Sequence, residues 1–163
     1  MTVMAKPSRA MATSVEVDQS GKVERTQIDT VLAFANGRSY AIRIPASVKR
    51  QALEFLRQKP RHAKNKKAMY LRLFSAGLFI LLKDQLKMCG EIIIDAEYTG
   101  SDADIRGMLL TWIRQTDSEF VKSRLAFRQI GKKSPAHDLA LAVFRGVRRA
   151  DYVVTFEDLL TWL

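Results

Sequence analysis

The chain has 163 residues and 47% of them are hydrophobic, which suits one globular domain with a full core. Cys89 is the only cysteine, so an intrachain disulfide and a multi-cysteine zinc site are excluded. There are 27 Lys and Arg against 17 Asp and Glu. The net charge of +10 favours a polyanionic partner, nucleic acid above all, because basic side chains replace the counterions around phosphates.

Two segments bear on the location of the protein. Residues 1–12 are basic and rich in small residues without periodicity, so we expect a flexible basic arm. The longest apolar run, residues 73–82, is too short to cross a bilayer, and no secretory signal precedes the first predicted strand. These features predict a cytoplasmic protein that does not associate with a membrane.

The first predicted elements are strands. Alternating apolar residues predict a strand over residues 13–18, which ends at a polar turn that contains Gly21. Residues 30–35 and 39–44 are two further strand-like segments separated by Asn36-Gly37, the dipeptide best suited to a tight hairpin turn. This part of the chain therefore predicts an antiparallel meander.

The middle of the chain changes to helical periodicity. Prolines bound a predicted helix over residues 45–59, and a basic linker follows it. A strongly apolar helix is predicted over residues 63–87. Gly90 is expected to separate this helix from a strand over residues 91–98. Three successive isoleucines in that strand indicate burial on both faces.

The remaining elements alternate between helix and strand. Ser101 and Asp104 have the spacing of a capping pair at the start of the next helix. Residues 124–130 form a predicted strand, and Ser134-Pro135 begins a helix that we expect to reach residue 149, before a short strand and a last helical turn. A meander followed by this alternation predicts an α/β fold with a mixed sheet and helices on its faces.

Acidic and basic residues are separated along the sequence. Residues 45–72 contain nine Lys or Arg and one acid, and residues 122–149 contain eight bases and only Asp138 as an acid. Residues 91–104 reverse this balance, with five acids and no base. The sequence therefore predicts a concentrated acidic site within a broadly basic surface.

Three aspartates lie where predicted elements begin or end. Asp18 and Asp95 come at the carboxyl ends of two apolar strands, where open sheets place their ligand sites, and Asp138 lies in the first turn of a helix. Carboxylate oxygens are the ligands that Mg²⁺ and Mn²⁺ prefer, and such ions promote phosphodiester hydrolysis. Non-catalytic roles are also open: Asp18 can begin a turn, and Asp138 can stabilise a helix dipole.

The order of elements and the three acids together resemble the ribonuclease H-like superfamily. The matching stretches are VEVDQSGKVE with Asp18, EIIIDAEYTG with Asp95 and SPAHDLALAV with Asp138, within a single domain over residues 13–163. The resemblance implies a three-strand meander followed by alternating strands and helices, with these aspartates as catalytic metal ligands. It also implies Mg²⁺ or Mn²⁺ as the cofactor.

Further candidates surround this set. The superfamily often has a Glu on its first helix, so Glu54 is a candidate fourth metal ligand, and Glu97 is its rival because it lies two residues beyond Asp95. His137 is a candidate to orient a water molecule or act as a general base. The candidate nucleic-acid contacts are the basic residues Lys22, Lys64, Lys66, Lys67, Lys132, Lys133, Arg145 and Arg149.

A second, weaker resemblance involves the C-terminal stretch HDLALAVFRGVRRADYVVTFEDLL, which is similar to the closing helix, strand and acidic turn of PIN-domain ribonucleases. A PIN domain lacks the hairpin that Asn36-Gly37 predicts. Both resemblances imply a metal-dependent nuclease, and a small domain favours a single-strand exonuclease. The alternatives are a nonenzymatic DNA- or RNA-binding protein on the same fold and an assembly factor that contacts a ribonucleoprotein.

Overall fold

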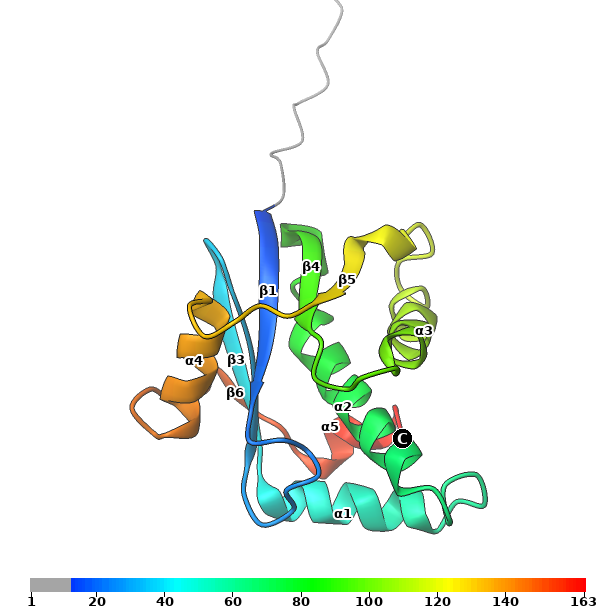
Figure 1. Cartoon of the computed structure of the whole chain (residues 1–163). Helices are drawn as coiled ribbons and strands as arrows, with labels where there is room; N and C mark the ends of the chain where they lie inside the picture. Colours follow the sequence, from blue (N-terminus) through cyan, green and yellow to red (C-terminus); the bar gives the residue numbers. More distant parts are fainter. Residues whose placement is uncertain (1–12) are drawn as a thin grey trace, which may run out of the picture.

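An antiparallel meander forms one half of a six-stranded mixed sheet in the computed structural model, which describes residues 13–163 (Figure 1). The predicted arm over residues 1–12 lies outside the described residues. The sheet order is β5-β4-β1-β2-β3-β6. The strands are β1 (Thr13–Ser20), β2 (Thr30–Ala35), β3 (Ser39–Ile44), β4 (Cys89–Asp95), β5 (Leu125–Arg128) and β6 (Tyr152–Val153).

The sheet contains both antiparallel and parallel strand pairs. β1, β2 and β3 pair antiparallel, and the hairpin at Asn36-Gly37 joins β2 to β3 as the sequence predicts. β4 lies parallel to β1, and β5 lies parallel to β4. Parallel neighbours need a crossover connection, and helices supply it. The helices are α1 (Ala46–Arg57), α2 (Lys66–Leu82), α3 (Asp102–Ile113), α4 (Pro135–Phe144) and α5 (Phe156–Leu160), with short 3₁₀ turns at Leu86–Met88 and Lys122–Arg124.

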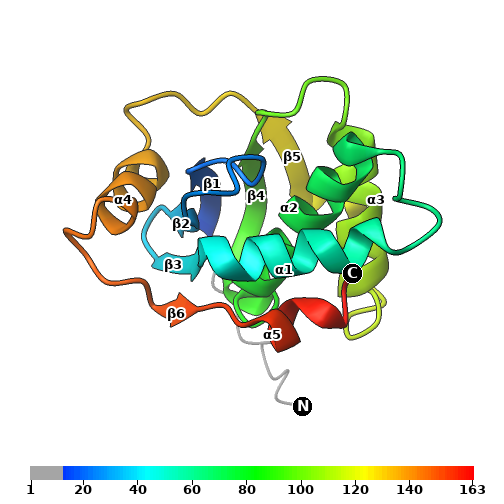
Figure 2. The same cartoon turned by 90° about the horizontal axis from the view of Figure 1, so that it is seen from below.

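The two faces of the sheet carry side chains of different size. Leu32 and Phe34 of β2 belong to the large core, which also contains the buried residues of α1, α2 and α3. Ala33 and Ala35 point to the other face, where they pack with Ala140 and other small residues of α4. Figure 2 shows α4 on one side of the sheet and the other long helices on the opposite side. Small residues therefore let α4 approach the sheet closely.

The cover that α4 provides is incomplete, and this positions the site. The helix packs on β1, β2 and β3. The segment 129–134, which leads from β5 to α4, crosses in front of β4 and β1 (Figure 1). The carboxyl end of β4 consequently lies beside this loop, whose Ile130 N–H reaches Asp95, whereas the neighbouring end of β1 is contacted by α4.

Several predicted boundaries are wrong. Gly90 lies inside β4, which begins at Cys89. Ser101 is the N-cap of α3 but its side chain makes no capping hydrogen bond. The predicted helix to residue 149 ends at Phe144, because Gly146 adopts a φ of 76° and its N–H donates to the carbonyl of Val143.

The apolar helix predicted over residues 63–87 is shorter than expected and spans Lys66–Leu82. The side chain of Asn65 accepts a hydrogen bond from the N–H of Ala68 and caps its start. Within residues 13–163, none of the helices combines the length and apolar character that crossing a membrane requires.

Candidate metal centre

Parallel pairing of β1 and β4 brings two predicted aspartates side by side. Val17 pairs with Ile94, so Asp18 and Asp95 are the next residue on each strand and point to the same face. Glu97 follows two residues after Asp95. Each of the three carboxylates offers an oxygen within 4.8 Å of the others, and this group is the one set of three potential metal ligands found among residues 13–163.

Each carboxylate of this cluster is held by a hydrogen bond. The N–H of Gln19 donates to Asp18 Oδ1 at 2.8 Å, and the N–H of Ile130 donates to Asp95 Oδ1 at 3.1 Å. Gln19 Nε2 donates to Glu97 Oε2 at 2.5 Å. These contacts leave Asp95 Oδ2 and Glu97 Oε1 without a hydrogen-bond donor from the described residues. The backbone therefore fixes the orientation of the aspartates and leaves ligand oxygens available.

His137 reaches the cluster from α4. Ser134 caps this helix by accepting a hydrogen bond from the N–H of Ala136, and its Oγ donates to Glu16 Oε1 of β1 at 3.1 Å. This contact holds the first turn of α4 against β1. His137 Nδ1 then lies 2.9 Å from Asp18 Oδ2. The pair leaves His137 Nε2 free for a further contact.

Burial makes the ionised cluster unfavourable. Desolvation, followed by the nearby charges of Asp18 and Asp95, raises the pKa of Glu97 to about 7, against the lowering effects of Gln19 and Lys22. Burial also raises the pKa of Asp18, although its hydrogen bonds to Gln19 and His137 act in the opposite direction. A cation at the cluster would remove this penalty, because it offsets both the desolvation and the repulsion.

A second layer of polar contacts surrounds the cluster. The Tyr98 hydroxyl lies 3.4 Å from Gln19 Nε2 and donates to Glu24 Oε2 at 3.3 Å. Burial raises the pKa of this hydroxyl far above its ordinary value. Glu24 lies in the β1–β2 connection, so Tyr98 links that connection to the loop after β4.

A buried lysine shapes the same connection. Lys49 of α1 has no exposed surface, and its Nζ donates to the carbonyl of Arg25 at 2.7 Å and to Thr30 Oγ1 at 3.0 Å. A longer contact of 3.3 Å reaches the carbonyl of Lys22. Burial lowers the pKa of Lys49 to about 8. This lysine holds the backbone of the β1–β2 connection beside the cluster.

The cluster lines an open pocket of about 390 Å³. Its wall is formed by the two strand ends on one side and by the segment after β5 with His137 on the other. The lining residues are Asp18, Gln19, Asp95, Ala96, Glu97, Gln129, Ile130, Gly131, Lys132 and His137. A polar anionic floor with a basic edge can hold a cation and the phosphate that the cation binds.

Two predicted ligands lie outside the cluster. Asp138 is exposed on α4 and lines a different pocket with Ser39 and Arg148. Successive helix residues are about 100° apart, so when His137 faces β1, Asp138 cannot. Glu54 is exposed on α1, across the sheet, where it pairs with Arg57. Glu97, the rival prediction for the fourth ligand, is the acid that joins Asp18 and Asp95.

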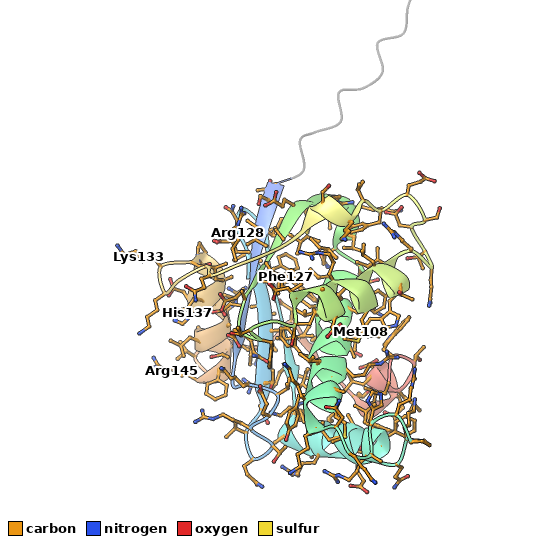
Figure 3. The ribbon with its side chains drawn as sticks, turned by 45° about the vertical axis from the view of Figure 1, so that its right-hand side comes forward. Met108, Phe127, Arg128, Lys133, His137 and Arg145 are labelled. Carbon is orange, nitrogen blue, oxygen red and sulfur yellow. The ribbon has the colours of Figure 1, made fainter. Side chains whose placement is uncertain are left out.

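The predicted basic contacts divide into three groups. Lys132 lines the cluster pocket, with exposed Lys133 next to it, and Lys22 is exposed on the β1–β2 connection. Figure 3 shows Lys133 and Arg145 at the outer side of the α4 region and His137 nearer the central strands. Arg149 lies beyond the end of α4, so it does not belong to the helix that was predicted to reach it. Lys64, Lys66 and Lys67 are exposed at the start of α2, away from this pocket.

Sequence reasoning missed Gln19 and Tyr98. Each directly follows a predicted acid, Asp18 or Glu97, but neither side chain carries a charge that would indicate a ligand. Their roles depend on the approach of the loop after β4 to the end of β1, which is a tertiary contact. Comparison of the chain with protein-family models, curated proteins and solved structures gives no match.

Proposed function

We propose that this protein is a divalent-metal-dependent nuclease that hydrolyses phosphodiester bonds in nucleic acid. The observation that carries the proposal is the convergence of Asp18, Asp95 and Glu97 within 4.8 Å at the ends of adjacent parallel strands. The antiparallel meander and the parallel strands that follow it agree with the arrangement that a ribonuclease H-like fold implies. This agreement supports the resemblance that the sequence indicates.

The donor set fits Mg²⁺ or Mn²⁺. Both ions prefer carboxylate oxygens and retain several waters, so three carboxylates with two uncommitted oxygens suffice as protein ligands. The raised pKa values of Asp18 and Glu97 are a further argument, because desolvation of these buried acids outweighs the lowering effects of His137 and Lys22. When bound, the cation would polarise the phosphate and lower the pKa of the attacking water.

In the proposed hydrolysis, individual residues of the site have separate roles. Asp18, Asp95 and Glu97 would hold the cation, and the N–H groups of Gln19 and Ile130 keep the two aspartates in place. If the His137 Nδ1–H donates to Asp18, Nε2 becomes a proton acceptor that faces no other described partner. His137 would then accept a proton from the attacking water, while Lys132 neutralises part of the phosphate charge.

Single-stranded nucleic acid is the substrate that we favour. The carboxylates line a pocket that is bounded by the segment after β5. A flexible single strand can place one phosphate in this pocket, whereas a duplex would also have to fit its second strand against that segment. The position of Asp138 favours one alternative function. Since that residue lies outside the cluster, a nonenzymatic nucleic-acid-binding protein is the second candidate.

Cleavage of end-labelled single-stranded and duplex DNA and RNA, in Mn²⁺, Mg²⁺ or EDTA, tests the proposal. We expect metal-dependent cleavage of single strands that Asp95→Asn reduces at least about 100-fold, because it removes a ligand charge. Asp138→Asn is the matched control, and it should stay within about threefold of the wild type because its side chain is exposed and outside the cluster.

Two results would contradict the nuclease. The first is binding of nucleic acid without cleavage in any metal, which would support the binding protein. The second is cleavage that Asp95→Asn leaves unchanged, since this would indicate a contaminating enzyme. Equal losses in Asp95→Asn and Asp138→Asn would instead show that the side chain of Asp138 reaches the substrate or the cation.

A further inference from the structure

A second pocket lies on the other side of the central strands from α4. It has a volume of about 280 Å³ and opens between the α1–α2 connection, the first turns of α2 and the start of α3. Figure 3 shows Met108 of its wall and His137 of the metal centre on opposite sides of the central strands. The lining residues are Arg61, His62, Ala68, Leu71, Arg72, Asp104 and Met108.

His62 is the unusual residue of this pocket. Both of its ring nitrogens are buried, and neither has a hydrogen-bond partner. Burial lowers the pKa of the imidazole, and the neighbouring charges of Arg61, Arg72 and Lys59 lower it further. Rotation about the Cβ–Cγ bond exchanges ring nitrogens with ring carbons, so the side chain can turn a nitrogen to the pocket without changing its shape. A buried polar group without a partner needs an explanation, and a bound anion that accepts its N–H is one.

Two arginines supply positive charge on the same wall. Arg72 Nε donates to the carbonyl of Trp162 at 2.8 Å, and its guanidinium lies 5.0 Å from the centre of the Trp112 ring. This fixed guanidinium and the exposed Arg61 make no ion pair with an acid of the described chain within 4.0 Å. Asp104 is the acid of the pocket lining, and it is exposed at the start of α3.

We propose that Arg61, His62 and Arg72 form a phosphate-binding site, separate from the metal centre, that takes a nucleotide phosphate. Guanidinium groups match the oxygens of a phosphate in charge and in geometry, and an imidazole can donate to a third oxygen. The apolar wall of Ala68, Leu71 and Met108 then suits the sugar or base that a nucleotide carries. The site does not depend on the carboxylate cluster or on cleavage.

Imidazole resonances give a direct test, because the chain contains only two histidines. Proton–carbon spectra of the full-length protein would be recorded while inorganic phosphate is added at constant ionic strength, and His62→Gln would assign the signals. We expect the His62 signal to move saturably while the His137 signal stays in place. A nucleoside monophosphate should bind more tightly than inorganic phosphate because it also contacts the apolar wall.

Exposed variants keep this test independent of folding. Arg61→Gln should weaken phosphate binding about tenfold, because it removes a charge-assisted hydrogen bond. Asp104→Asn should strengthen phosphate binding, because the substitution removes a negative charge that repels the phosphate. Arg38→Gln is the matched control, since Arg38 is also exposed, lies on the β2–β3 hairpin and does not line the pocket.

The same spectra separate this proposal from the nuclease. Mg²⁺ should move the His137 signal and leave His62 unchanged, whereas phosphate should do the reverse. A short single-stranded oligonucleotide that moves His62 in the Asp95→Asn protein would identify the nucleic-acid backbone as the source of the phosphate. The site is wrong if phosphate gives no saturable shift of His62, if chloride gives the same shift, or if Arg38→Gln weakens binding as much as Arg61→Gln.

Discussion

At the scale of single residues, Glu97 shows how one buried carboxylate couples stability to pH. Its pKa is about 7 in the folded protein against an ordinary value of 4.5. Between these values the folded protein holds a proton that the unfolded chain has released. The free energy of unfolding of the metal-free protein therefore falls as the pH rises from about 4.5 to about 7.

This dependence gives a prediction for Glu97→Gln. In EDTA, the wild type should lose roughly 1–3 kcal/mol between pH 5 and pH 8 through this residue, after allowance for its partial exposure. Glu97→Gln should show a smaller loss, because it removes this titrating carboxyl group. Urea denaturation at the two pH values measures both. Identical pH dependence in wild type and variant would contradict the raised pKa of Glu97.

A divalent metal should counteract the loss of stability at high pH. Ligand carboxylates must be ionised, so Mn²⁺ or Mg²⁺ should stabilise the wild type more at pH 8 than at pH 5. Glu54→Gln is the matched control, because Glu54 is an exposed acid that pairs with Arg57 outside the cluster. It should leave the metal dependence unchanged.

At the scale of elements, the position of α4 relative to β1 decides whether His137 reaches Asp18. Three contacts hold this helix: Ser134 to Glu16 at its start, Arg43 to the carbonyl of Val143 at its end, and a close approach of Phe144 to Gly21. Gly21 has a φ of 71°, and a Cβ there would lie 2.3 Å from the carbonyl oxygen of Asp29. Only glycine fits this approach.

Gly21→Ala should therefore destabilise the protein by about 2–4 kcal/mol, through backbone strain and the clash with Asp29 and Phe144. It should also reduce cleavage, since Phe144 and the rest of α4 must shift. Gly146→Ala is the matched control, because Gly146 has a φ of 76° but no atom near its would-be Cβ. We expect about 1–2 kcal/mol there. Equal losses in urea denaturation would show that the close approach does not exist.

At the scale of the whole molecule, the acidic cluster lies within a chain of net charge +10. A net charge of this sign would attract a polyanion to the surface, whereas the cluster alone would repel it. Lys132 lies at the edge of the cluster pocket, where it offsets this repulsion. Under the proposed function, the charge of the whole molecule would favour binding, while the position of a few lysines would decide where the phosphate enters.

The salt dependence of binding tests whether net charge and the lysines beside the pocket contribute separately. For the Asp95→Asn protein, affinity for a single strand should fall linearly with salt on a double logarithmic plot. Replacing Lys132 and Lys133 by Gln should reduce the slope by about 0.7 for each phosphate contact that is lost. The matched control replaces the exposed Lys83 and Lys87, which lie around the end of α2, and should change the slope less. Equal changes would indicate binding by net charge alone.

The local pattern of the sequence was sufficient for most of the elements. Alternating apolar residues predicted β1, and three successive isoleucines predicted β4 as a strand buried on both faces. β4 does lie between two other strands, but Ile93 is only half-buried, so burial on both faces is incomplete. Helix ends were less predictable: α4 stops at Phe144 because the backbone turns at Gly146, although the apolar pattern continues. Such ends depend on single dihedral angles that periodicity does not report.

The sequence by itself determined the concentration of acids, the excess of bases on either side of them and the two aspartates that follow apolar strands, because strand period and charge are local properties. That these two strands are neighbours is a tertiary contact. Only the tertiary structure decided which further groups meet them. The choice between Glu97, Glu54, His137 and Asp138 depends on the loop after β4 and on the rotation of α4 against β1. Contacts between segments about 80 to 120 residues apart fix both, and no local pattern encodes them.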